Sequence, residues 1–445
     1  MCAPNRSVRA ALSPCGVSRF RPSRRSCVTK SAQVCFETRN GLFRFAVKPI
    51  RNVGGGTVTA RRRRPASSEA EDEEDRVPAR KRGQRPLPHA LGLRDIEPLP
   101  AAGGAGKLAA FAVYRPGSLA PWWLHQGVCA AWGLDVFRTE LRLVTVSENA
   151  TFSVLVDEKP YAMARVSQPD YAGGALAVAS ELSWVRALGN IADVNVVEPL
   201  PMASGFDVAT IRDEGGFEWL CVCTRFVPGA TLEAPADPSR WYETIGACAA
   251  RMHAQSRQWR PPQGFTRFSW DIDAIAGDHP RWGSWRDAPL SADESFLFDR
   301  AEWAAREVVA RHGRTSANWG LIHADLRPSN IIIGPDGELT LIDFDDCGYS
   351  WFLYDFAAAL TFVEHKPYAP AMAQRWVEGY RSVTALDDAQ LEFACALSML
   401  RRLQMIGWAR NHYRDALPAG LLDEQVPGTV TCAERYLEDP LWLFE

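Results

Sequence analysis

Three oxygen-bearing side chains stand close to one short stretch of the chain, and their spacing predicts a metal–phosphate site. Two apolar runs, 331–333 and 339–342, flank the sequence Gly-Pro-Asp-Gly, a pattern typical of a β-hairpin. Antiparallel pairing about this turn sets residues whose numbers sum to 673 opposite each other, give or take one residue, so Asn330 and Asp343 meet at one end. Asp325 arrives on the loop just before the hairpin. Hard cations such as Mg²⁺ bind oxygen ligands of this kind, with phosphate and water completing the shell.

The same residues, in the same order, resemble the catalytic core of a known superfamily. The sequence His-Ala-Asp, then Asn330, then Asp343-Phe-Asp345 is similar to that of the aminoglycoside phosphotransferases and choline kinases, which are relatives of the protein kinases. The branch that contains type II homoserine kinase and stress-response kinase A looks closest. The resemblance is dense over the hairpin and thinner over Leu141–Leu421. It implies a protein-kinase-like α+β fold with a small antiparallel β lobe and a larger, mostly helical lobe.

The resemblance implies a role for each matching residue. Asp325 would accept or orient the proton of the acceptor hydroxyl as that hydroxyl attacks the γ-phosphate of ATP. Asn330 and Asp343 would hold the Mg²⁺ ions that bridge the phosphates. Arg327 stands where protein kinases carry a Lys two residues after the catalytic Asp, so it would contact the transferred phosphoryl group.

Other residues of this stretch are expected to support the site. His323 would hold the catalytic loop, and Asp355, at the start of a predicted helix, would brace that loop through backbone N–H groups. Asp345 replaces the last Gly of the protein-kinase Asp-Phe-Gly, which argues against a protein-kinase-type activation switch. An alternative interpretation treats His-x-Asp as half of an iron site completed by His365 or His412. That alternative leaves the two remaining oxygen ligands without a role.

The residues that precede this stretch read as a β-rich unit. Strands are predicted at Leu141–Val146, Thr151–Val156 and Tyr161–Val166, the last two joined by a polar turn at 157–160. The first two are joined by a turn that carries Ser147 and Asn149 and occupies the place of a kinase phosphate-covering loop. It lacks the Gly-x-Gly-x-x-Gly pattern, but its small polar residues are expected to offer backbone N–H groups to phosphate.

A charged pair is predicted where this unit meets its helix. The helix spans Gly174–Leu188, and apolar residues recur on one face of it together with Glu181. An unpaired carboxylate on an apolar face is costly, so Glu181 needs a partner, and Arg165 on the preceding strand is the obvious one. The pair resembles the Lys–Glu pair that positions the α- and β-phosphates in kinases, with Arg in place of Lys. A surface ion pair with no ligand is the other interpretation.

A further hairpin, 207–211 with 218–224, leads into the expected connection between the lobes. By the resemblance, backbone groups around Phe226 bind the base of the nucleotide, and the side chains there do not indicate whether that nucleotide is ATP or GTP. The second lobe is predicted to be helical, with one long connector, 259–285, rich in Trp, Arg, Asp and Pro. Its helices are expected at Trp241–Gln255, from the capping box Ser291–Glu294 to Gly313, at Pro370–Arg381 and at Asp387–His412.

The charge of the chain is unevenly distributed. The 445 residues carry a formal net charge of −3, but residues 1–68 hold 15 of the 50 basic residues and 1 of the 53 acidic ones. The remainder has 35 basic against 52 acidic residues, a net charge of −17, which argues against a nucleic-acid partner. No apolar run is long enough for a membrane helix. The eleven cysteines show no zinc spacing, which favours reduced thiols in a cytoplasmic protein.

Three segments are therefore expected. Residues 1–88 form a basic and then acidic extension, which is disordered, a transit peptide or the product of an unused upstream start. Residues 89–226 form the N-terminal lobe, and residues 227–445 form the C-terminal helical lobe with the catalytic loop and metal site.

The predicted function is an ATP- and Mg²⁺-dependent phosphotransferase that acts on a hydroxyl of a small molecule such as an amino acid, amino alcohol or aminoglycoside. A Ser/Thr protein kinase similar to stress-response kinase A and a non-catalytic nucleotide-binding module are the alternatives. The intact Asp325, Asn330 and Asp343 argue against the non-catalytic module. The sequence does not fix the acceptor or the oligomeric state.

Overall fold

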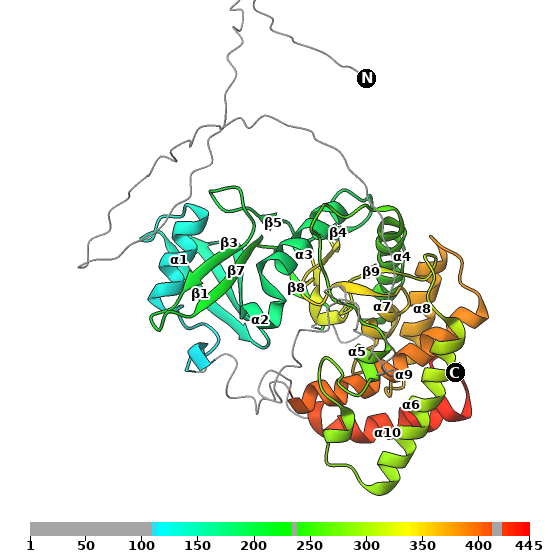
Figure 1. Cartoon of the computed structure of the whole chain (residues 1–445). Helices are drawn as coiled ribbons and strands as arrows, with labels where there is room; N and C mark the ends of the chain where they lie inside the picture. Colours follow the sequence, from blue (N-terminus) through cyan, green and yellow to red (C-terminus); the bar gives the residue numbers. More distant parts are fainter. Residues whose placement is uncertain (1–108, 112, 234–237, 412–420) are drawn as a thin grey trace, which may run out of the picture. The chain divides into compact units, whose positions relative to one another are not determined.

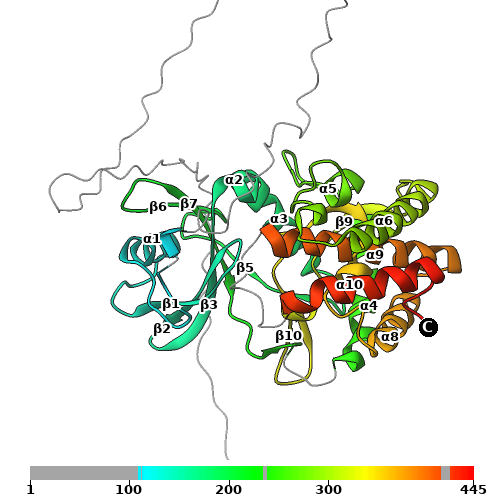
Figure 2. The ribbon, with the colours of Figure 1, turned by 90° about the horizontal axis from the view of Figure 1, so that it is seen from below.

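The computed structural model of the protein describes residues 109–111, 113–233, 238–411 and 421–445 (Figure 1). The predicted extension, residues 1–88, lies outside them. The two parts expected from the sequence are both present: Figure 2 shows the strands β1, β2 and β3 on one side and the helices α4, α6, α8, α9 and α10 gathered on the other. None of the helices in the described ranges combines the length and the apolar character that a membrane-spanning segment needs.

A six-stranded antiparallel sheet forms the small lobe. Its strand order is β1-β2-β3-β7-β5, and β6 also pairs with β7. The strands are β1 (Thr139–Val146), β2 (Ala150–Val156), β3 (Lys159–Ser167), β5 (Pro199–Leu200), β6 (Ala209–Arg212) and β7 (Glu218–Arg225). Buried and exposed residues alternate along β1 and β2, because one face of the sheet packs on the core. The three predicted strands are confirmed, and each is longer than expected.

The turn between β2 and β3 is shorter than predicted. It consists of Asp157 and Glu158 alone, because Lys159 and Pro160 already pair with β2. Both turn residues have positive φ, 48° and 64°, which is the geometry of a type I′ hairpin turn. This turn matches the twist of the flanking strands, so the hairpin closes with two residues instead of four.

Two main helices complete the small lobe, α1 (Trp122–Trp132) and α3 (Gly174–Leu188). Helix α1 packs closely on the sheet, since a Cβ at Gly127 would lie 2.4 Å from Cγ2 of Ile211 in β6. Helix α3 has the predicted bounds. The residues predicted to share one face of it are all buried, namely Val178, Glu181, Val185 and Leu188. Short helical turns lie at η2 (Ala109–Phe111) and α2 (Pro169–Ala172).

The second lobe is mostly helical. Its helices are α4 (Tyr242–Gln258), α5 (Ile272–Ala276), α6 (Ala292–His312), α7 (Tyr354–Ala359), α8 (Ala369–Arg381), α9 (Asp388–Asn411) and α10 (Leu421–Glu438), with short turns η3 (Ser239–Trp241), η4 (Trp285–Asp287) and η5 (Pro328–Asn330). The predicted capping box of α6 is present, with Ser291 and Glu294 bonded reciprocally. Helices α4 and α8 cross at glycines, because a Cβ at Gly246 would lie 2.0 Å from the Trp376 carbonyl oxygen.

Two small sheets carry the catalytic stretch. One has the order β4-β11-β10-β8 and the other pairs β12 with β9. Their strands are β4 (Asn195–Val196), β8 (Ala230–Thr231), β9 (Trp319–Ile322), β10 (Ile331–Ile333), β11 (Leu339–Leu341) and β12 (Gly348–Trp351). The β10–β11 hairpin is confirmed, but paired residues sum to 672, as in Ile332 with Thr340. Asn330 therefore lies opposite Ile342, whose N–H donates to its carbonyl at 2.9 Å, and Asp343 follows one residue later.

Candidate active site

The catalytic loop and the end of the hairpin bring the predicted oxygen ligands together. Asn330 Nδ2 donates to the main-chain oxygen of Asp325 at 2.9 Å and to its carboxylate Oδ2 at 2.7 Å. Ala324 and Asp343 have positive φ, 66° and 61°, a conformation that residues other than Gly rarely adopt. Such strained residues persist where the surrounding structure holds them, and they cluster at functional sites.

The catalytic loop is held by a buried carboxylate from α7. Asp355 accepts from the backbone N–H groups of His323 at 3.2 Å and Ala324 at 2.7 Å, which are the predicted bonds. His253 Nε2 lies 3.0 Å from the same carboxylate. His323 Nε2 lies 3.1 Å from the carbonyl oxygen of Ile342, so His323 links the loop to the hairpin. The loop is therefore fixed from two sides before any ligand binds.

Both oxygens of the Asp325 carboxylate are bonded to cationic side chains. Arg327 Nε donates to Oδ2 at 2.9 Å, and Arg401 Nη2 donates to Oδ1 at 2.7 Å. Burial raises the pKa of Asp325, but Arg327 and Arg401 outweigh burial and hold the pKa below its ordinary value. Asp325 is therefore ionised and fixed in orientation, so it suits a role in aligning a hydroxyl more than in strongly attracting its proton.

The residues present fit a divalent cation. Asn330 Nδ2 donates twice to Asp325, and Oδ1 accepts only a 3.3 Å bond from the Ser329 hydroxyl, so this oxygen has a lone pair left for a cation. Asp343 contributes a carboxylate that is 45% exposed. The pKa of Asp343 lies well above its usual range. Loss of hydration within the site and the negative charge of the neighbouring Asp345 both raise this pKa, and Arg165 lowers it only in part. Two oxygen donors from protein are what Mg²⁺ usually takes when phosphates supply others.

The iron alternative gains no ligand set in the structure. Among residues 109–111, 113–233, 238–411 and 421–445, no group of three or more His, Cys, Asp and Glu side chains is placed to hold a metal ion. His365 lies 3.7 Å from Glu424 instead. His412 lies outside the described residues.

The Arg165–Glu181 pair forms as predicted. Arg165 Nη2 donates to both carboxylate oxygens of Glu181, at 2.8 and 2.7 Å, and Nη1 lies 3.6 Å from Asp343. The side chains are 14% and 4% exposed, so this is not a surface ion pair. Within the described part of the chain, the buried Nε of Arg165 has no hydrogen-bond partner. A phosphate oxygen could accept a hydrogen bond from this buried N–H of the charged guanidinium.

An apolar cavity of about 310 Å³ extends from this pair to the connection between the lobes. Its walls come from the small-lobe sheet, α3, the segment around Phe226 and the β10–β11 hairpin. The lining residues named in the sequence analysis are Arg165, Glu181, Phe226 and Asp343. Its volume falls in the range of small-molecule sites, and its apolar lining with one charged end suits a nucleotide whose base enters first.

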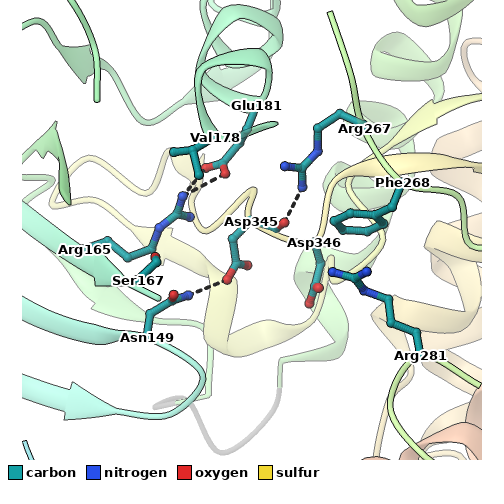
Figure 3. A pocket seen from close by; sticks show the side chains of 10 residues that line it. All are labelled: Asn149, Arg165, Ser167, Val178, Glu181, Arg267, Phe268, Arg281, Asp345 and Asp346. Atoms are coloured by element: carbon teal, nitrogen blue, oxygen red, sulfur yellow. Dashed lines mark hydrogen bonds and ion pairs between the residues drawn. The ribbon is translucent and has the colours of Figure 1, made fainter. Parts of the chain in front are cut away.

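The turn between β1 and β2 closes the charged end of the site (Figure 3). Asn149 Nδ2 donates to Asp345 Oδ2 at 2.6 Å, and the indole N–H of Trp408 donates to Glu148 Oε1, also at 2.6 Å. Asn149 lines a chamber of about 10 Å³, room for one water molecule. Ser147 lines neither this chamber nor the larger cavity as described. Its predicted contact with phosphate, like that of Asn149, stays a prediction.

Sequence reasoning missed three residues of the site. Arg401 comes from α9, 76 residues after Asp325, and Glu148 is the turn residue bonded to α9. Arg267 is 3% exposed and lies in the 259–285 connector. The position of Arg401 could have been predicted from helical periodicity, because it follows Leu397 by four residues on the apolar face of its helix. Glu181 is likewise a charged residue on the apolar face of α3. Arg267 and Glu148 sit in irregular segments that have no such periodicity.

A small antiparallel lobe with a buried Arg–Glu pair, joined to a helical lobe that carries the bonded Asp325 and Asn330, has the α+β arrangement of a kinase-like phosphotransferase. Sequence comparison gives the family. Residues 141–393, more than half of the chain, match the "Phosphotransferase enzyme family", and the chain belongs to it. It is a phosphotransferase with an alcohol group as acceptor.

Individual relatives are small-molecule kinases. The chain is 33% identical to a microcompartment-associated aminopropanol kinase of known structure, with a TM-score of 0.64 over 72% of this chain and 98% of that one. It is 26% identical to the amicoumacin kinase of Bacillus subtilis (strain 168) over 61% of this chain and 80% of the relative. A solved amicoumacin kinase in complex with AMP-PNP, Ca²⁺ and Ami shares the fold, at 20% identity and a TM-score of 0.57, over 70% and 92% of the two chains.

Proposed function

We propose that the protein transfers the γ-phosphate of ATP, with Mg²⁺, to a hydroxyl of a small amine-bearing molecule, an amino alcohol before an amino acid or an aminoglycoside. The observation that carries this proposal is the convergence of Asp325, Asn330 and Asp343 beside the Arg165–Glu181 pair at the charged end of an apolar cavity. A solved amicoumacin kinase that shares the fold is in complex with AMP-PNP and Ca²⁺, which supports a nucleotide and a divalent cation as cofactors.

The chain's own side chains then have distinct tasks. Asp325, held by Arg327 and Arg401, aligns the acceptor hydroxyl and takes its proton as the phosphoryl group moves. Arg165 offers Nε to a phosphate oxygen while Glu181 holds its other arm. When bound through Asn330 and Asp343, Mg²⁺ would neutralise charge on the phosphates.

Two observations support the acceptor class, namely the negative charge of nearby carboxylates and the similarity to an aminopropanol kinase. Burial raises the pKa of Asp346, and the nearby carboxylates of Asp345, Asp325 and Glu148 add to this rise, so negative charge is concentrated in this region, which favours a cationic acceptor. The relative with 33% identity is named for aminopropanol, an amino alcohol.

The test is transfer from γ-labelled ATP by the full chain to a panel of amino alcohols, hydroxy amino acids, aminoglycosides and a Ser/Thr-containing peptide, with and without Mg²⁺. GTP replaces ATP in a parallel series. Mg²⁺-dependent label on an amino alcohol is the expected result. Label on the peptide alone would replace the small-molecule acceptor with a protein, and no label or nucleotide binding under any condition would overturn the proposal.

A further inference from the structure

The connector between α4 and α6 contains a buried arginine that joins two parts of the site. The guanidinium of Arg267 donates to three main-chain carbonyls: Nη1 to Ala177 at 3.1 Å, Nε to Cys347 at 2.6 Å, and Nη2 to Asp345. Ala177 belongs to α3, whereas Asp345 and Cys347 follow the predicted metal ligand Asp343. In the ranges that the structure describes, no carboxylate forms an ion pair with Arg267, whose charge is met by these three carbonyl oxygens and by the Phe268 ring, 4.6 Å from Cζ.

Arg267 does not act alone on α3. The N–H of Thr266 donates to Ser180 Oγ at 3.0 Å, and Ser180 is 4% exposed on the same helix. Ala177 lies one turn before Glu181, and Ser180 directly precedes it, so both attachments hold the turn of α3 that carries Glu181. A shift of this turn would move Glu181 away from Arg165 on β3.

The connector is itself fixed to the segment it braces. The N–H of Tyr349 donates to the Phe268 carbonyl at 2.9 Å, and the N–H of Trp270 donates to the Tyr349 carbonyl at 2.8 Å, so residues 268–270 run alongside β12. Gly348 is required there, because a Cβ would lie 2.7 Å from the Phe268 carbonyl oxygen. Figure 3 shows the guanidinium of Arg267 above Asp345, between α3 and the Asp345–Asp346 segment.

We propose that Arg267 is a positioning residue that fixes helix α3 against the 343–347 segment, so that the Arg165–Glu181 pair and the predicted metal ligand Asp343 share one geometry before nucleotide binds. Protein kinases bring the equivalent helix and metal segment into place through a separate activation segment. Here only Asp345, Asp346 and Cys347 separate Phe344 from β12, which leaves no room for such a segment. In the inference, Arg267 holds the helix and the metal segment together at all times instead. This inference rests on the proposed nucleotide site.

The test is a double-mutant cycle between Arg267→Met and Glu181→Gln in the full chain, read as the dissociation constant of Mg²⁺–ATP without acceptor. Arg267→Met alone is expected to weaken nucleotide binding roughly tenfold, since small misplacements of a charged site cost factors of this size or more. If Arg267 acts through the pair, the double variant binds no more weakly than Glu181→Gln alone. Additive losses, or an Arg267→Met variant with wild-type affinity, would overturn the inference.

Two further variants keep the test decisive if Arg267→Met does not fold. Arg267→Lys keeps the charge but cannot reach three carbonyls in one plane, so its nucleotide affinity should fall between those of wild type and the Met variant. Ser180→Ala removes the attachment to Thr266, together with the bond from the same hydroxyl to the Leu176 carbonyl within α3, and should produce a smaller loss in the same direction. Unchanged affinity in both would contradict the inference. Wild-type protein that binds no nucleotide would instead refute the proposed function, so the two failures are distinguishable.

Discussion

The two acidic centres of the active site, the catalytic loop around Asp325 and the segment after Asp343, are balanced in opposite ways. Asp325 is paired with Arg327 and Arg401, and its pKa lies below the ordinary value even though burial raises it. Asp343 is crowded by other carboxylates, with Arg165 at 3.6 Å, and burial and Asp345 raise its pKa. The charge of Asp325 is balanced by two arginines of the protein, whereas that of Asp343 is balanced only in part, by Arg165.

This contrast separates chemistry from ligand capture. The loop proposed to align the hydroxyl is held by Arg327, Arg401 and Asp355 of the chain itself, without any ligand. The segment proposed to hold the metal carries carboxylates that Arg165 offsets only in part, so a divalent cation bound there with its nucleotide would lower their repulsion. Substitutions in the two regions should therefore fail in different assays.

The largest effect is expected from Asp325→Asn. Loss of the carboxylate should lower kcat by about 10²–10⁴-fold, the contribution typical of a positioned general base, while Mg²⁺–ATP binding is kept. Transfer of labelled phosphate and nucleotide titration measure the two quantities separately. Wild-type turnover in this variant would sink the assignment of Asp325.

Asp343→Ala should give the converse result. Without its carboxylate the site keeps the apolar cavity, but Mg²⁺ no longer increases nucleotide binding, and turnover falls as a consequence. The measurement is the shift in Tm with ATP, with and without Mg²⁺. Asp336→Asn, an exposed acid in the turn of the same hairpin, is the matched control and should respond as wild type does. A Mg²⁺-dependent shift that survives in Asp343→Ala would contradict the comparison.

Arg401→Met tests whether the catalytic loop is balanced by the protein. The Arg401 side chain is fully buried and its removal leaves Asp325 with one cation, so unfolding free energy should fall by about 3–5 kcal/mol, the usual cost of breaking a buried pair. Among the folded molecules kcat should fall while the KM for ATP holds. Chemical denaturation and steady-state kinetics measure these, and a rise in the KM for ATP alone would assign Arg401 to nucleotide binding instead.

The smallest effect concerns pH and the support of the catalytic loop by His253. Burial lowers the pKa of His253, although Asp355 opposes this shift, so the folded protein keeps the imidazole neutral. As pH falls below about 6.5, the unfolded chain takes up a proton that the folded chain does not, and stability decreases. In His253→Gln the Tm at neutral pH is lower, but its slope with pH below this value should be shallower. An unchanged slope would remove His253 from the acid response.

The sequence was most informative where local rules and chemistry agree. Helix α3 was predictable from its helical periodicity, and the start of α6 from its capping box. The Arg165–Glu181 pair was predictable because a charged residue on an apolar face needs a partner of opposite charge. The hairpin was predictable as well, and its pairing sum of 672 lies within the one-residue tolerance of the prediction, because turn geometry decides which residues face each other. In this register Ile342 lies opposite Asn330, and Asp343 is the next residue along the chain.

Residues joined over long distances were beyond reach. The contacts of Arg267 and the bond between Glu148 and Trp408 depend on how segments 78 to 260 residues apart pack together, and no periodicity reports on such packing. The helical pattern marks Arg401 as a buried charge, but it does not identify Asp325, 76 residues away, as the partner. The roles assigned to Ser147, Asn149 and Phe226 rest on the resemblance and remain predictions. Phe226 lines the cavity, whereas Asn149 is already bonded to Asp345.

The turn between β1 and β2 has a consequence for kinetics. Glu148 is bonded to Trp408 and Asn149 to Asp345, so the turn is attached to the opposite lobe at two adjacent residues. If the phosphates bind beneath this turn, as proposed from the resemblance, the turn would have to release these two bonds to let the nucleotide out. Opening of the turn then contributes to the dwell time of the product, and weakening either bond should shorten that time even where the chemical step is unaltered.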